Sequence, residues 1–122
     1  MMVNWVVGLI GAVLTLVGVL GFVSGPMFLV FGINPLHNLV HLASGILGLL
    51  AAGVSGGRWA SLYARAFGII YVVVAIIGFV APRLMASLLS INMPDNWLHL
   101  VLGLVLSVVG FGMPASVARR SG

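Results

Sequence analysis

Four long apolar stretches constrain this chain more than any other feature of its sequence. A helix needs about 20 apolar residues to cross the roughly 30 Å hydrocarbon core of a bilayer. The third of these stretches either ends at Val80 or continues past Pro82 toward Leu89. We expect a single all-α membrane domain over residues 1–122, because the four stretches use most of the chain: Val3–Val23, Pro35–Ala52, Tyr63–Val80 (with the extension, toward Leu89) and Asp95–Phe111.

Composition agrees with this class. Hydrophobic residues make up 62% of the chain and charged residues only 5%, whereas soluble domains carry about a quarter charged residues. A soluble enzyme and a disordered chain are therefore disfavoured, and the absence of Cys excludes a disulfide scaffold. The net charge of +4 comes from scattered arginines that form no basic stripe, so we expect no nucleic-acid partner.

The arginines predict an orientation, because positively charged loops stay on the cytoplasmic side. Arg58 and Arg65 lie near the junction of the second and third stretches, and Arg119 and Arg120 follow the fourth. With four spans these residues share one side of the membrane, and only Arg83 lies on the other. We expect both termini in the cytoplasm and the first and third connections outside.

The two halves of the chain repeat each other. Gly11–Val23 matches Gly68–Val80 at an offset of 57 residues, and Ile33–Gly45 matches Ile91–Gly103 at an offset of 58. Apolar matches are common between membrane helices, whereas two matched Asn residues and a matched His are not, so these polar matches identify an internal repeat. The repeat also argues for keeping the first stretch as a membrane helix rather than a signal peptide.

Each repeat, about 8–53 and about 65–112, contains two spans, so both repeats insert with the same orientation. Repeats of that kind are related by an axis along the membrane normal. We therefore expect four transmembrane helices arranged as two tandem helical hairpins around a pseudo-two-fold axis. The second and fourth helices would occupy equivalent places.

Polar residues are confined to two windows of the repeat. Of the five Asn, three His and one Asp, all except Asn4 fall within 34–41 and 92–99. Each window has the outline Asn-x-x-(His/Asp)-Asn-x-x-His, counted from Asn34 and from Asn92. This double motif is the most specific feature of the sequence.

Capping explains the start of each window. Asn34 precedes Pro35, and this is the pattern of an N-cap followed by proline at the first helical position. Asn92 is expected to cap the fourth helix in the same way. Asp95, three residues further on, takes the place of the acid in a capping box.

The spacing of the ionisable residues favours a metal site between the second and fourth helices. His37 and His41 lie four residues apart, and so do Asp95 and His99, so each pair shares a helix face. The pseudo-two-fold would bring all four together. Three imidazoles and a carboxylate form a tetrahedral set for Zn²⁺, or a site for Fe or Cu.

Two alternatives use the same residues. In the first, His41, His99, Asn38 and Asn96 hydrogen-bond across the axis as a structural clasp. In the second, His41 and His99 are axial ligands of a haem or a chlorophyll, since each precedes a glycine by four residues. In the metal interpretation, Asn38 and Asn96 would instead orient the imidazoles.

At these motifs the sequence resembles a known family. Asn34–Leu42, Asp95–Leu100 and Ala64–Tyr71 are similar to segments of small bacterial four-span membrane proteins, catalogued only as a domain of unknown function. The resemblance covers about Gly8 to Phe111. It implies the four-span fold and a bacterial plasma membrane, or a thylakoid membrane in a cyanobacterial member, and it brings no activity, substrate or cofactor.

Catalysis is disfavoured, because Asp95 is the only carboxylate side chain and no nucleophilic Cys exists. We expect a non-catalytic membrane protein with an outward-facing His/Asn/Asp cluster that binds a transition metal. The alternative is an accessory or structural subunit of a larger membrane complex, or a homo-oligomer, in which the cluster is the clasp or the pigment site.

Overall fold

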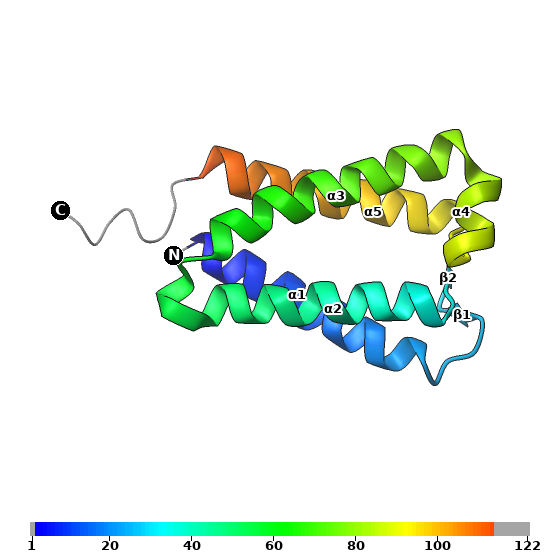
Figure 1. The fold of residues 1–122 in the computed structure, drawn as a ribbon, viewed down its shortest axis with the longest axis horizontal. Helices are drawn as coiled ribbons and strands as arrows, with labels where there is room; N and C mark the ends of the chain where they lie inside the picture. Colours follow the sequence, from blue (N-terminus) through cyan, green and yellow to red (C-terminus); the bar gives the residue numbers. More distant parts are fainter. Residues whose placement is uncertain (1, 114–122) are drawn as a thin grey trace.

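The computed structural model describes residues 2–113, which are almost entirely helical (Figure 1). This confirms the expected all-α class with four long apolar helices. The elements follow in the order α1 (Met2–Gly21), β1 (Met27–Phe28), β2 (Phe31–Gly32), α2 (Pro35–Gly53), the 3₁₀ turn η1 (Val54–Gly57), α3 (Ala60–Val80), α4 (Pro82–Leu89) and α5 (Met93–Gly112).

The long helices pack as two hairpins laid against each other. Helix α1 packs along α2 and helix α3 packs along α5 (Figure 1). The short elements β1, β2 and α4 gather at one end, formed by residues 22–34 and 81–92, which we call the cap end. The start of α1 and the connection at residues 54–59 form the opposite end, which we call the N-terminal end.

Large apolar side chains cover the outside of the bundle. Trp5 is 77% exposed and Val80 is 79% exposed, and many other large apolar side chains are about half exposed. Such a surface belongs in lipid, because each Å² of apolar surface removed from water is worth about 25 cal/mol. The four long helices of the described region, with 19 to 21 residues each, are also long and apolar enough to cross a bilayer. The chain is a multi-pass membrane protein.

The third span ends at Val80, as expected, and the possible extension past Pro82 toward Leu89 is wrong. Helix α3 ends at Val80, Ala81 leaves the helical region with φ −127° and ψ 63°, and Pro82 begins the separate helix α4. Proline lacks the N–H that would continue the ladder and disfavours the helical conformation in the residue before it. The first span is also shorter than expected, since α1 ends at Gly21 rather than at Val23.

Glycines let the two helices of each hairpin meet backbone to backbone. A Cβ atom on Gly45 would lie 2.8 Å from the carbonyl oxygen of Gly11, and one on Gly103 would lie 2.9 Å from that of Gly68. The sequence repeat pairs Gly11 with Gly68 and Gly45 with Gly103. The same close approach at matched positions supports a duplication, and the pseudo-two-fold axis stays a prediction.

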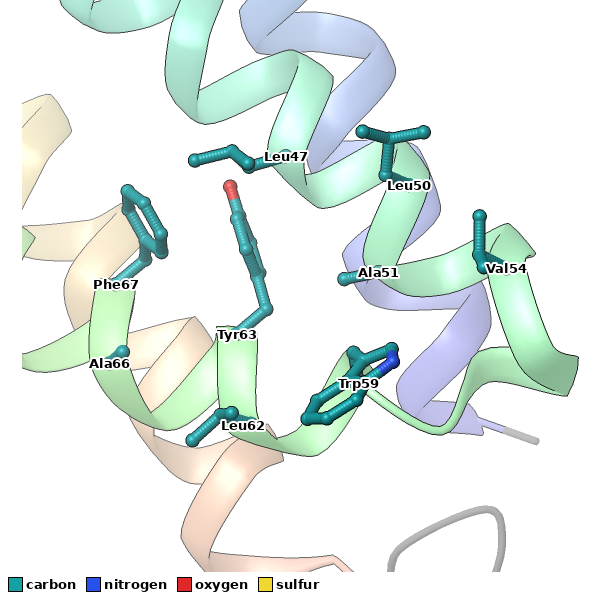
Figure 2. A pocket seen from close by; sticks show the side chains of 9 residues that line it. All are labelled: Leu47, Leu50, Ala51, Val54, Trp59, Leu62, Tyr63, Ala66 and Phe67. Atoms are coloured by element: carbon teal, nitrogen blue, oxygen red, sulfur yellow. The ribbon is translucent and has the colours of Figure 1, made fainter.

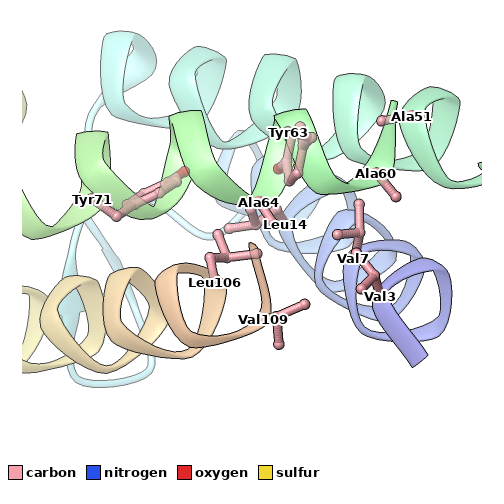
Figure 3. Packing of buried hydrophobic residues seen from close by; sticks show 10 residues of the cluster. All are labelled: Val3, Val7, Leu14, Ala51, Ala60, Tyr63, Ala64, Tyr71, Leu106 and Val109. Carbon is pink, nitrogen blue, oxygen red and sulfur yellow. The ribbon is translucent and has the colours of Figure 1, made fainter. Parts of the chain in front are cut away.

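The apolar core lies toward the N-terminal end of the bundle (Figure 3). It includes Val3 and Val7 of α1, Ala60 and Ala64 of α3, and Leu106 of α5, none of which is more than 1% exposed. The buried histidines and the buried acid lie in the first two turns of α2 and α5, which start at the cap end. The interior is therefore apolar at one end and polar at the other.

Candidate metal centre

The site is built on the first turns of α2 and α5. The side chain of Asn34 caps α2 by accepting a hydrogen bond from the His37 N–H at 2.8 Å. Asn92 caps α5 by accepting from the Asp95 N–H at 3.1 Å, and the Asp95 carboxylate accepts from the Asn92 N–H at 3.0 Å. This reciprocal pair is a complete capping box, and α2 has only the simpler cap.

Each capping asparagine also reaches the other hairpin. The Asn34 amide donates to the Leu88 carbonyl oxygen in α4 at 3.1 Å, and the Asn92 amide donates to the Val30 carbonyl oxygen between β1 and β2 at 2.9 Å. These two bonds are reciprocal, since each hairpin gives one donor and one acceptor. They fix the starts of α2 and α5 relative to each other, and the sequence motif did not predict them.

The three histidines converge between α2 and α5. The ring centroids of His37 and His41 lie 4.4 Å apart, and the His99 centroid lies 5.6 Å from that of His37 and 5.9 Å from that of His41. One ligand nitrogen from each ring lies within 4.8 Å of the other two, and no ring is more than 3% exposed. A tetrahedral Zn²⁺ with metal–nitrogen distances of about 2.0–2.1 Å would place two ligand nitrogens about 3.4 Å apart. The three nitrogens would therefore have to move closer together to hold one ion.

Most ring nitrogens of this cluster lack a hydrogen-bond partner. Both nitrogens of His37, both nitrogens of His99 and the Nδ1 of His41 are buried and form no hydrogen bond of standard length and angle within residues 2–113. The backbone of Leu89 and of Gly32 interacts with His37 at longer range. Buried polar atoms nearly always have a partner, and an unpaired one indicates an ion or a water. Because a neutral imidazole has one lone pair free for coordination, the cluster retains the donor atoms that an ion needs.

Asp95, expected as a fourth ligand, lies beside this group without belonging to it. Its side chain is fully buried, and one carboxylate oxygen is engaged in the capping box with Asn92. The other oxygen forms no hydrogen bond of standard length and angle in the described part of the chain, and the Gly32 backbone interacts with this carboxylate at longer range. The ligand atoms that lie within 4.8 Å of one another come from the three imidazoles and do not include the Asp95 carboxylate.

Asn38 and Asn96 pack against the neighbouring helix of their own hairpin. A Cβ atom added to Gly21 would collide with the Asn38 amide, and one added to Gly78 would collide with the Asn96 amide. The Asn96 nitrogen lies 3.8 Å from the Met93 sulfur. Among the described residues, neither amide hydrogen-bonds to an imidazole, so no bond supports the expected orienting role. The cross-axis hydrogen bonds of the clasp alternative are likewise not formed there.

One further residue joins the cluster that sequence reasoning did not assign to the site. The ring of Tyr71 in α3 lies 5.6 Å from that of His99. Its buried hydroxyl forms no hydrogen bond of standard length and angle in the region described, and it interacts with the Ser44 side chain at longer range. Figure 3 shows this hydroxyl directed along α3 toward Tyr63, away from the cap end. The sequence did contain a signal for this residue. A tyrosine in the middle of an apolar span indicates a buried hydroxyl, and a buried tyrosine hydroxyl usually needs a hydrogen-bond partner.

Fold and site together define a class: a multi-pass membrane protein of four long helices with a buried three-histidine cluster toward one end of the bundle. The chain belongs to the family described as Domain of unknown function (DUF4383), which it matches over residues 4–112. That range contains nearly all of the four long helices and both polar windows. No curated protein and no solved structure matches the chain. The resemblance to an uncharacterised family is confirmed.

Proposed function

We propose that His37, His41 and His99 bind one transition-metal ion between α2 and α5, and that the ion joins the two hairpins. One observation carries the proposal. Three buried imidazoles place ligand nitrogens within 4.8 Å of one another, and most of their ring nitrogens lack a hydrogen-bond partner in the described residues. The ion would supply the partner that these lone pairs lack.

The chemistry of the ligands narrows the choice of ion. Imidazole suits Zn, Cu, Fe and Ni, and we favour Zn, Fe or Cu. Three protein ligands leave at least one coordination position for water or an exogenous ligand. The positive ends of the α2 and α5 dipoles act against a cation, and this effect fades beyond the first turn. His41 and His99 lie in the second turn of their helices, whereas His37 lies in the first turn of α2. The buried Asp95 carboxylate would offset part of the ionic charge.

The packing of the rings supports an ion over a haem or a chlorophyll. A macrocycle with two axial histidines needs an open slot between them. The His37 ring lies 4.4 Å from the His41 ring and 5.6 Å from the His99 ring, so it occupies the space beside both. A single ion fits such a cluster without moving a helix.

A structural role is the alternative function, and a separate observation favours it. The reciprocal hydrogen bonds of Asn34 to Leu88 and of Asn92 to Val30 join the two hairpins at the cap end without any ion. In this alternative the protein is an accessory subunit of a larger membrane complex or a homo-oligomer, and the histidines add only packing.

We also propose a location and an orientation, the bacterial plasma membrane with the N-terminal end on the cytoplasmic side. Arg58 and Arg65 lie toward that end, and Arg83 lies at the cap end. Arg119 and Arg120, which also enter the expectation, lie outside the described residues. This orientation would open the metal site toward the outer face.

Single-cysteine labelling tests the orientation directly, because the native chain contains no cysteine. Ser24→Cys and Ser87→Cys lie at the cap end, and Gly53→Cys lies at the other end, where a side chain meets open space. The first two variants should react with a membrane-impermeant maleimide in intact cells, and the third only after lysis. The reverse pattern would place the site on the cytoplasmic side.

Metal analysis of the purified protein tests the central proposal. Protein extracted in mild detergent, loaded separately with Zn²⁺, Cu²⁺ or Fe²⁺ and then desalted, should retain about one ion of at least one metal per chain. Replacing His37, His41 and His99 together by Ala should abolish retention, because no other group of three His, Cys or acidic side chains with this spacing occurs among the described residues.

Tyr63→Phe is the matched control. Its hydroxyl donates to the Ser44 carbonyl oxygen at 2.7 Å, so the variant removes a buried interhelical hydrogen bond without touching the cluster. It should lose stability and keep its metal. If the wild-type protein retains no metal and the triple-Ala variant changes only stability, the structural alternative replaces the metal proposal.

A further inference from the structure

An apolar groove runs between α2 and α3 toward the N-terminal end (Figure 2), and no residue of the histidine cluster lines it. It encloses about 490 Å³, within the roughly 300–1,000 Å³ of typical ligand sites. Leu50 of α2, with Trp59 and Leu62 at the start of α3, forms part of its wall. Each of these three side chains is more than half exposed, so the groove opens on the outer surface of the bundle.

The groove marks the seam between the two hairpins. Ala51 on α2 and Ala66 on α3 contribute small side chains to its wall, and Tyr63 lies between the two helices. The Tyr63 hydroxyl bonds to the Ser44 carbonyl oxygen of α2 at 2.7 Å, so the helices are joined at the inner side and open at the outer side. Because both helices span the membrane, the open side faces lipid, and an acyl chain is the matching shape.

A basic residue adjoins the groove in the sequence. Arg58 immediately precedes Trp59 of the groove wall, and its side chain is exposed. The only acidic side chain of the sequence, Asp95, lies at the cap end and cannot neutralise it. The next arginine along α3, Arg65, already donates from Nε to the Gly110 carbonyl oxygen at 2.8 Å. Arg58 is thus available to an anion at the membrane surface, where a phosphate is the common one.

We propose that this groove is a binding site for one anionic glycerophospholipid. One acyl chain lies between α2 and α3 against Tyr63, and the phosphate meets Arg58 at the level of Trp59. The arrangement combines an aromatic side chain at the interface, a basic residue beside it and an apolar slot below, which together recognise both parts of a lipid. The lipid would fill the seam between the hairpins in the leaflet at the N-terminal end.

Quenching of tryptophan fluorescence by brominated lipids tests this site in nanodiscs. The chain has three Trp, and the Trp5→Phe/Trp97→Phe background leaves Trp59 as the only reporter. Brominated phosphatidylglycerol, diluted into unlabelled phosphatidylcholine, should quench Trp59 severalfold more than its bulk fraction predicts. Brominated phosphatidylcholine at the same fraction should quench in proportion to its bulk fraction.

Matched variants separate the head-group contact from the groove. Arg58→Gln should reduce the excess quenching by phosphatidylglycerol to the bulk value, and Arg83→Gln, an exposed arginine at the cap end, should leave it unchanged. Ala66→Leu, which fills the groove, should also remove the excess. Ala12→Leu, on the exposed face of α1, should not.

Three outcomes would overturn the proposal. The first is equal quenching by the two brominated lipids in the wild-type background. The second is an equal loss in the Arg58→Gln and Arg83→Gln variants, which would indicate a general charge effect. The third is quenching that disappears as the protein-to-lipid ratio rises, which would mean that a second copy of the chain covers the groove. None of these outcomes bears on metal binding at the opposite end.

Discussion

The two hairpins share one packing plan and differ at one position of the motif. Each begins its second helix with a capping Asn, and each places a His seven residues later, at His41 and at His99. One turn before that shared His, the first hairpin has His37 and the second has Asp95. The His37 ring joins the cluster, whereas the Asp95 carboxylate completes a capping box. At this matched position, one hairpin thus has a residue of the histidine cluster and the other has a capping residue.

This difference makes the candidate centre asymmetric. Helix α2 supplies two imidazoles of the cluster and α5 supplies one, so in the proposed centre His99 would be the ligand from the second hairpin. By contrast, both hairpins have backbone contacts at matched glycines and an Asn side chain that caps the second helix, although only α5 has a complete capping box. Variants at matched positions should therefore behave alike in packing and capping and differently in metal binding.

The largest effect is expected for His99→Ala. Losing a direct ligand should cost more than losing a group that orients one, which typically lowers metal affinity 10- to 100-fold. We expect a fall of at least roughly 100-fold, measured by competition with a chelator of known affinity in detergent. A fall of less than about tenfold would mean that α5 does not bind the ion.

Gly45→Ala and Gly103→Ala should both destabilise the protein, by about 1–3 kcal/mol each, since overpacking has costs in this range. At both positions a Cβ atom would press on the backbone of the adjacent helix. Reversible unfolding in mixed micelles measures the change. Gly53→Ala is the control, because its Cβ meets nothing within 4 Å. Similar losses at both sites support the duplication, and a loss at only one contradicts matched packing.

Asn34→Ala and Asn92→Ala should each lower the unfolding free energy by about 1 kcal/mol, the usual cost of losing an N-cap. The two losses should be similar, because each variant removes one cap acceptor and one amide donor to the other hairpin, and the Asn92 backbone N–H that donates to the Asp95 carboxylate remains. Ser87→Ala is the reference variant. The exposed Ser87 hydroxyl in α4 donates to the Leu84 carbonyl oxygen within the same helix, so its loss should change the unfolding free energy by nearly zero. If neither cap variant differs from this reference, the cross-hairpin bonds contribute nothing to the fold.

The smallest effect is expected for Asp95→Asn. The amide can still accept the backbone bond of the cap, and the variant removes only the negative charge beside the cluster. Metal affinity should fall by less than about tenfold, in contrast to His99→Ala. A loss as large as that of His99→Ala, in the same chelator competition, would make Asp95 a direct ligand and would restore the four-ligand site that the spacing suggested.

Much of the fold was predictable because it depends on local patterns. Apolar length alone determines four spans, and the dipeptide Asn34-Pro35 marks where α2 begins. The end of α3 is indicated by Pro82 and not by hydrophobicity, because apolar residues continue on both sides of the break. The proline restricts the backbone of the residue before it, and this restriction ends the helix.

The candidate site was predictable in composition and less so in geometry. The repeat indicated that His37, His41 and His99 would converge, because matched windows meet where equivalent helices pack. The position of Asp95 was not decided by spacing, since a carboxylate three residues after an Asn suits a cap and a ligand equally well. The proximity of Tyr71 to His99 depends on how α3 crosses α5, which no local pattern encodes.

X-ray absorption spectroscopy at the edge of the bound metal tests the central claim most directly. With the retained ion in place, the extended fine structure should show three imidazole ligands with metal–nitrogen distances of about 2.0–2.1 Å for Zn²⁺. Their outer-shell scattering should be that of intact imidazole rings. A first shell with one imidazole or none would contradict a centre shared by His37, His41 and His99.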